Sequence, residues 1–180
     1  MLTPLIQENL YRSQIDKNIC DKAHLFISKH QEKFTHQTWD CKIRTSYSLT
    51  NNILNIKDLH ELKMHVLSHI NNYLHLKKYF TDGYIHSSWV NIYEKDFYQE
   101  FHDHEDPILN TLSGVIYLTE NNSNIEFNVK NTMQFSPKFS DIILFPDHTL
   151  HRVAPNKNNS LRISLAFNFA FCKQWEIISL

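Results

Sequence analysis

Side chains that bind metals gather in one short stretch of this chain. His102, His104 and Asp106 alternate along it with other residues. Side chains two apart on a β-strand project to the same face, so His102 and His104 converge, as do His104 and Asp106 if the strand continues that far. Imidazole nitrogens and a carboxylate oxygen at this spacing predict a metal site.

A third ligand is expected from a distant strand. His151 follows an apolar run over residues 141–145 and a turn over residues 146–148. Three protein ligands on one face of an octahedron leave the opposite positions open, the arrangement expected of non-haem Fe(II) oxygenases. His148, inside the turn, is the local alternative to His151. The spacing therefore predicts an iron site.

A cation and a hydroxyl share one face of the last predicted strand. Arg162 and Ser164 are two apart, so both side chains project from the same side. A buried arginine is costly without a counter-charge. A dicarboxylate could supply that charge through a bidentate pair, with a hydrogen bond from the serine. We expect an acidic co-substrate to bind here.

The spacing of hydrophobic residues in the elements that position these groups changes once along the chain, from helical to strand-like. Apolar residues recur at helical spacing over residues 16–34 and 58–80, which predicts two amphipathic helices. After Gly83, short β-rich runs separated by polar turns predict strands over residues 86–94, 98–104, 112–119, 125–130, 141–145, 151–154 and 161–171. The expected fold is mainly β with N-terminal helices (α+β). It is a double-stranded β-helix, a cupin-like jelly roll, with the helices packed outside one sheet.

Length and composition favour one globular domain. The 180 residues form a single expected unit, with a helical support region over 1–83 and a jelly-roll core over 84–172. A net charge of −1 offers no broad field for nucleic acid or anionic lipid, and no run is apolar enough to span a membrane. Three widely spaced cysteines without a CxxC pair fit free thiols in a reducing cytoplasm, the host cytoplasm if the source is viral.

Three segments together resemble a known family. They are FHDHEDPILNTLSGVIYL, DIILFPDHTLHRVAPN and LRISLAFN, which begin at residues 101, 141 and 161. They are similar to the 2-oxoglutarate- and Fe(II)-dependent oxygenases, most of all to the phage and bacterial branch related to prolyl 4-hydroxylases. The resemblance covers roughly Ser88 to Asn168, and the helical N-terminal half only weakly.

The resemblance implies roles for individual residues. His151 resembles the distal iron ligand, and Arg162 with Ser164 resembles the R-x-S pair that binds the far carboxylate of 2-oxoglutarate. Tyr117 resembles a tyrosine that hydrogen-bonds the same carboxylate. Asn91 would line the mouth of the pocket, although it could equally take part in packing between the sheets.

The first ligand motif departs from the family pattern. The superfamily usually has His-x-Asp or His-x-Glu here, whereas this chain offers both His102-x-His104 and His104-x-Asp106. Pro107 removes a ladder hydrogen bond and tends to end the strand, which favours the earlier pair. Asp106 would then orient an imidazole instead of binding iron. Both alternatives stay open.

The reaction implied is a hydroxylation that consumes 2-oxoglutarate and O2 and releases succinate and CO2. Kinship with prolyl hydroxylases suggests a prolyl or other peptide side chain as substrate, and Phe101, Phe145 and Leu118 are expected to form a dry wall. Two alternatives use the same fold: a cupin-type metal enzyme without 2-oxoglutarate, and a non-catalytic jelly-roll structural or binding module. The sequence predicts neither the substrate nor the oligomeric state.

Overall fold

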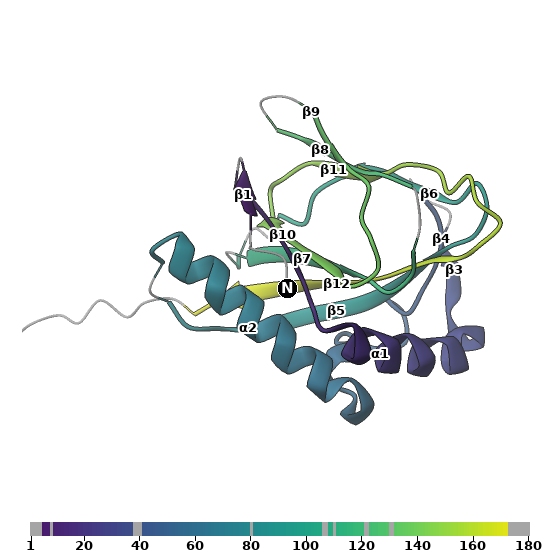
Figure 1. The fold of residues 1–180 in the computed structure, drawn as a ribbon, viewed down its shortest axis with the longest axis horizontal. Helices are drawn as coiled ribbons and strands as arrows, with labels where there is room; N and C mark the ends of the chain where they lie inside the picture. The colour runs from purple at the N-terminus through teal and green to yellow at the C-terminus, as the bar shows by residue number, and fades with distance from the viewer. Residues whose placement is uncertain are drawn as a thin grey trace, which may run out of the picture.

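A curled antiparallel β-sheet with two α-helices on one side makes up the protein (Figure 1). The computed structural model describes residues 5–7, 9–37, 41–79, 81–105, 108–109, 111–120, 123–129 and 132–172. The helices are α1 (Lys17–His30) and α2 (His60–Leu76), with short 3-10 helices η1 (Gln31–Lys33), η2 (Ile53–Asn55) and η3 (Lys57–Leu59). The strands are β1 (Leu5–Gln7), β2 (Leu10–Gln14), β3 (Thr35–Gln37), β4 (Cys41–Thr45), β5 (Gly83–Tyr93), β6 (Tyr98–His102), β7 (Thr111–Tyr117), β8 (Ile125–Asn128), β9 (Thr132–Phe135), β10 (Asp141–Pro146), β11 (His151–Val153) and β12 (Arg162–Phe171).

Strand β4 joins two layers of the sheet. The strand order is β1-β2-β10-β7-β12-β5-β4-β6-β11-β8-β9, with β3 paired to β4. Arg44 and Thr45 of β4 pair with β5, whereas Cys41 and Lys42 pair with β6. The sheet therefore folds over at β4, and the shorter layer β6-β11-β8-β9 faces the longer one. This is the predicted jelly roll, and the fold class is confirmed.

The helices cover the outer face of the longer layer (Figure 1). Val66 and Ile70 of α2 belong to one buried cluster with Ile116 of β7 and Leu165 of β12. Both predicted helices are present, each shorter than expected. No helix in the described part of the chain is long and apolar enough to cross a membrane.

Several short strands were not predicted. β2 extends the longer layer beyond β10, β4 forms the corner, and β9 edges the shorter layer. Each has only four or five residues, too few for a clear period of two in the sequence. Their partners lie far away along the chain, so their place in the sheet is decided by tertiary pairing.

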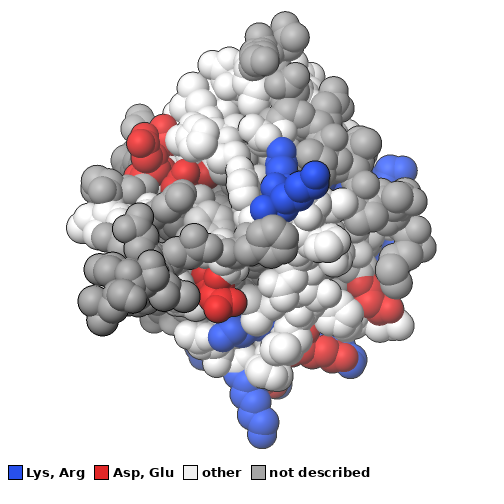
Figure 2. Space-filling model, turned by 90° about the vertical axis from the view of Figure 1, so that its left-hand side faces the viewer, with Lys and Arg blue, Asp and Glu red and all other residues white. Residues whose placement is uncertain are grey.

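Charged side chains are dispersed. On the face shown in Figure 2, the described Lys, Arg, Asp and Glu residues lie in small separate groups of both signs. This pattern agrees with the net charge of −1 for the whole chain.

Candidate metal and co-substrate site

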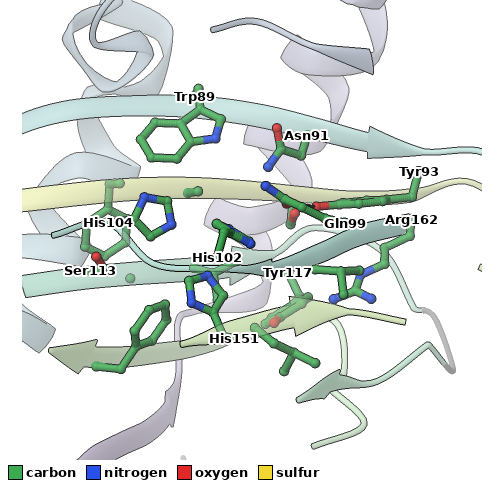
Figure 3. A pocket seen from close by; sticks show the side chains of 18 residues that line it. Trp89, Asn91, Tyr93, Gln99, His102, His104, Ser113, Tyr117, His151 and Arg162 are labelled. Atoms are coloured by element: carbon green, nitrogen blue, oxygen red, sulfur yellow. Dashed lines mark hydrogen bonds between the residues drawn. The ribbon is translucent and has the colours of Figure 1, made fainter. Parts of the chain in front are cut away.

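Three histidines meet between the two layers, two of them on the neighbouring strands β6 and β11 and the third just after β6 (Figure 3). His102 ends β6 and lies directly opposite His151, the first residue of β11, while His104 follows two residues beyond β6. The ring centroids of His102 and His151 are 4.2 Å apart, and each is 5.2 Å from that of His104. One nitrogen from each ring lies within 4.8 Å of the other two.

Backbone carbonyls set the orientation of two of these rings. Nδ1 of His102 lies 2.8 Å from the carbonyl oxygen of Glu100, and Nδ1 of His151 lies 2.8 Å from that of Thr149. A carbonyl only accepts, so in both rings Nδ1–H is the donor and Nε2 keeps its lone pair. A metal-binding histidine needs this tautomer, with its other nitrogen held by a hydrogen bond.

The surroundings keep all three imidazoles neutral. Burial lowers the pKa of His102. Burial, helped by the nearby His102, lowers the pKa of His104 to about 3. Burial also holds the pKa of His151 well below its usual value, with His102 and His104 adding to the effect. Since only neutral imidazole binds a metal, the cluster is ready for one at neutral pH.

Asp147 ties the segment that carries His104 to the rest of the sheet. The backbone N–H of His104 donates to the carbonyl oxygen of Asp147 at 2.9 Å. The carboxylate of Asp147 accepts from the backbone N–H of Thr111 at 3.0 Å and from its hydroxyl at 2.8 Å. The turn after β10 thereby holds both His104 and the start of β7.

The alternative ligands have different outcomes. The side chain of His148 is 70% exposed and contacts Asp147, so it lies apart from the cluster. Asp106 lies outside the described residues, and the choice between the two ligand motifs stays a prediction.

The expected apolar wall is only partly correct. Phe145 lines the cavity, with its ring 4.7 Å from that of His151. Phe101 instead lies on the outer face, 39% exposed, with the guanidinium of Arg152 4.8 Å from its ring. Leu118 belongs to the core beneath the helices. Both are sequence neighbours of cavity residues, and strand alternation turns them to the opposite face.

The other end of the same cavity holds the buried arginine (Figure 3). Arg162 is 1% exposed, and its guanidinium lies 5.3 Å from the rings of both Tyr93 and Tyr117. One terminal nitrogen donates to the carbonyl oxygen of Ser123 at 3.2 Å. Within the described part of the chain, no carboxylate pairs with Arg162.

Polar atoms without partners surround this cation. Ser164 pairs in the sheet with Asn91 and Tyr117, so all the predicted co-substrate residues line one cavity. Nε of Arg162, the hydroxyl of Tyr117 and Oδ1 of Asn91 are buried with no hydrogen-bond partner among the described residues. Burial raises the pKa of Tyr117 to about 12, against the opposing effect of Arg162, so its hydroxyl is a neutral donor. A carboxylate would satisfy both donors and offset the buried charge.

Gln99 is a cavity residue that alternation did not predict. Its Oε1 accepts from the hydroxyl of Tyr93 at 2.9 Å. His151 pairs with His102, but Val153 pairs with Gln99, so β6 has one residue more than β11 between the two pairs. This irregularity turns both Gln99 and His102 toward the cavity. A bulge of this kind has no signal in the sequence that we recognise.

We expect His151→Ala to abolish tight binding of Fe(II), or of Mn(II) as a stable substitute, because it removes one of three neutral ligands. His148→Ala is the matched control and should bind like the wild type, since that ring is exposed. Mn(II) titration followed by electron paramagnetic resonance measures both. Asp106→Ala in the same assay decides between the motifs, because only a His104-x-Asp106 site would lose the metal. Equal affinity in His151→Ala and wild type would exclude the histidine site.

Acid should destabilise the metal-free protein. The folded-state pKa values of His102, His104 and His151 are lowered, whereas unfolded histidines titrate near about 6.5. The unfolded chain therefore binds more protons, and the stability present above about pH 6.5 is lost as pH falls from there toward the folded values. Denaturant unfolding in chelator between about pH 7.5 and 5 should show this loss. In the variant His104→Gln, the free energy of unfolding should change less with pH than in the wild type. If the two proteins show the same slope of unfolding free energy against pH, the prediction that His104 is buried in its neutral form is wrong.

Comparisons with known proteins agree with this geometry. A family model described as "Putative 2OG-Fe(II) oxygenase" matches residues 119–168, the part that carries His151, Arg162 and Ser164. No curated protein sequence matches the chain.

Solved structures share the fold at low sequence identity. A prolyl-4-hydroxylase from Pseudomonas putida has a TM-score of 0.70 at 10% identity, over 90% of this chain and 92% of that one. A viral collagen prolyl hydroxylase from Paramecium Bursaria Chlorella virus-1, in complex with 2-oxoglutarate, has a TM-score of 0.66 at 16% identity, over 90% of this chain and 96% of that one. A prolyl hydroxylase from Trichoplax adhaerens, in complex with a peptide fragment of hypoxia inducible factor, has a TM-score of 0.67 at 13% identity, over 91% and 84%.

The resemblance seen in the sequence is thus supported by the family match, the shared fold and a cluster of histidines that could hold the metal. Over residues 119–168 the chain is similar to the 2-oxoglutarate- and Fe(II)-dependent oxygenases, and it shares its fold with solved structures of such enzymes.

Proposed function

We propose that the protein hydroxylates a C–H bond of a peptide side chain, with a prolyl residue as the first candidate. The reaction uses Fe(II), 2-oxoglutarate and O2 and releases succinate and CO2. One observation carries the proposal: the cavity that holds three neutral histidines also holds a buried arginine whose Nε lacks a partner among the described residues. Peptide substrates are supported by the fold shared with prolyl hydroxylases, one of them bound to a peptide fragment.

The histidines hold the metal in this proposal. His102, His104 and His151 would each offer one nitrogen, and bound iron supplies the activation of O2 that oxidises an unreactive C–H bond. The carbonyls of Glu100 and Thr149 keep two of the rings turned with Nε2 toward the cavity. Because these bonds exist before the metal arrives, binding needs little reorganisation.

The buried cation holds the co-substrate. Arg162 and the hydroxyl of Tyr117 would donate to the far carboxylate of 2-oxoglutarate, with Ser164 adding a hydroxyl. Asn91, on the neighbouring strand, would contact the same molecule. The aromatic rings of Tyr93 and Tyr117 beside the guanidinium exclude water, which strengthens each of these charge-assisted bonds.

Other aspects of the proposal rest on composition. Dispersed charges of both signs do not favour nucleic acid as a substrate, since such binding needs a basic surface. Cys20 is a buried cysteine outside any disulfide, which supports a reducing compartment such as the cytoplasm.

The reaction itself predicts a coupled release of products. With Fe(II), 2-oxoglutarate and O2, the wild type should form succinate, and an unfolded prolyl peptide should gain one oxygen atom in equal amount. Mass spectrometry of the peptide, with chromatography of succinate, measures both. Oxidation of a substrate without succinate would favour the cupin-type alternative, and metal binding without any turnover would favour a binding module.

Arg162→Lys should raise the KM for 2-oxoglutarate about tenfold to a hundredfold, the scale of losing a hydrogen bond to a charged group. Lysine keeps the charge but cannot present the planar pair of donors. Arg152→Ala is the control, because Arg152 is 41% exposed and pairs with Glu126 on the outer face. Its KM should match that of the wild type. Similar KM values for Arg162→Lys and wild type would remove the arginine from the co-substrate site.

A further inference from the structure

The cavity changes from polar to apolar along its length. The pairing of β12 with β5 and β7 fixes the order of the lining residues. Arg162 lies opposite Tyr93, and Ser164 lies between Asn91 and Tyr117. Ala166 then lies between Trp89 and Val115. Four residues along a strand span about 13 Å. Figure 3 shows Arg162 and Tyr93 at one end, Trp89 and His104 at the other, and His102 and His151 between them. His102 and His151 therefore lie between the polar end of the cavity and the opposite end, where Trp89, Val115 and Ala166 form an apolar compartment beside His104.

The apolar compartment is left free by the proposed co-substrate. Arg162, at the opposite end, is the one side chain among the described lining residues that carries a charge at neutral pH. A charged group entering beside Trp89, Val115 and Ala166 would lose hydration and would find no oppositely charged side chain among the described lining residues at that end. This compartment suits an apolar group.

A ring on the surface extends the apolar compartment outward. Tyr47, on the loop after β4, meets Trp89 edge to face at 86°, with ring centroids 5.4 Å apart. Trp89 is 8% exposed and lies 5.5 Å from His104, whereas Tyr47 is 62% exposed. Tyr47, Trp89 and His104 thus form a continuous path of rings from the surface to a metal ligand.

The loop holds Tyr47 in a defined position. The backbone N–H of Ser46 donates to the carbonyl of Val90 at 3.1 Å, and the hydroxyl of Ser46 accepts from the N–H of Val90 at 2.9 Å. The N–H of Tyr47 donates to the hydroxyl of Thr45 at 3.2 Å, and that hydroxyl donates to the Val90 carbonyl at 2.9 Å. An exposed ring on a backbone fixed in this way loses little entropy when it binds a partner.

Packing within the chain does not account for this exposed ring. Leu49, two residues on, is also 50% exposed, so the loop presents two large apolar side chains to solvent. Single exposed apolar residues are ordinary on a protein surface. An exposed ring that is held in place against Trp89, a residue of the cavity lining, indicates recognition of a partner.

We propose that Tyr47 and Trp89 form the subsite that determines substrate specificity, by stacking on an apolar residue next to the one that is oxidised. This rests on the proposed function and narrows it. The substrate class is an extended peptide whose target residue is flanked by a prolyl or aliphatic residue and not by charged ones. Tyr47 acts on binding of the substrate, and neither metal nor 2-oxoglutarate contacts it.

The test uses the full chain loaded with Mn(II) and 2-oxoglutarate, which binds substrate without turnover. The probes are fluorescein-labelled nine-residue Gly/Ser peptides with a central Pro flanked on both sides by Pro, Leu, Asp or Lys, and binding is followed by anisotropy. Tyr47→Ala should weaken binding of the Pro and Leu peptides about fivefold to tenfold, the scale of one aromatic contact. Tyr47→Phe should stay within about twofold of the wild type, because the ring is kept.

Tyr84→Ala is the matched control. Tyr84 is 53% exposed and contacts His86 edge to face, away from the cavity lining, so peptide binding should not change. The proposal is overturned if Tyr47→Ala binds as the wild type does, if no peptide binds the wild type, or if the Asp and Lys peptides bind as tightly as the apolar ones. Tyr47-dependent binding without succinate release would refute the proposed function alone. Succinate release with binding indifferent to Tyr47 would refute this inference alone.

Discussion

The pairing of β6 with β11 is the interaction on which the site depends. It sets His102 opposite His151 across the shorter layer, and His104 follows just beyond the paired segment. Backbone carbonyls of the same two segments then turn the rings of His102 and His151. If the register slipped by one residue, one imidazole would turn to the outer face, because side chains alternate along a strand. The candidate metal site is therefore a consequence of one backbone register.

The same cavity retains features that cost stability. Three kinds of group there would each favour unfolding or hydration: the three neutral histidines, a buried guanidinium with no carboxylate partner among the described residues, and buried polar atoms with no hydrogen-bond partner among them. Two tyrosine rings and the Ser123 carbonyl offset part of the cost at Arg162. The remainder is the free energy that a bound carboxylate and a metal ion can recover, which links the stability of the protein to its ligands. The rigid frame around the cavity, from Asp147 to the loop of Tyr47, keeps these groups in place meanwhile.

Elements with a long hydrophobic pattern in the sequence were predicted correctly, whereas several short ones were missed. Two long helical periods and most strands after Gly83 were predictable, because each contains enough residues to show its period. β2 and β4 were missed, since four or five residues stabilised by distant partners leave no local signal. Phe101 and Leu118 were wrongly predicted to line the apolar wall of the cavity. Each was chosen for its proximity in sequence to a site residue, although alternation turned it away.

The sequence alone determined the kinds of residue available: a His-x-His pair, a distant histidine, an Arg-x-Ser pair and the jelly-roll strands that carry them. These follow from local periodicity and spacing, which do not depend on contacts with distant segments of the chain. Only the tertiary structure decided that the histidines and the arginine share one cavity, that a bulge turns Gln99 inward, and that Tyr47 lies against Trp89. Each of these depends on register between segments far apart in the chain, and register is set by the packing of the whole sheet.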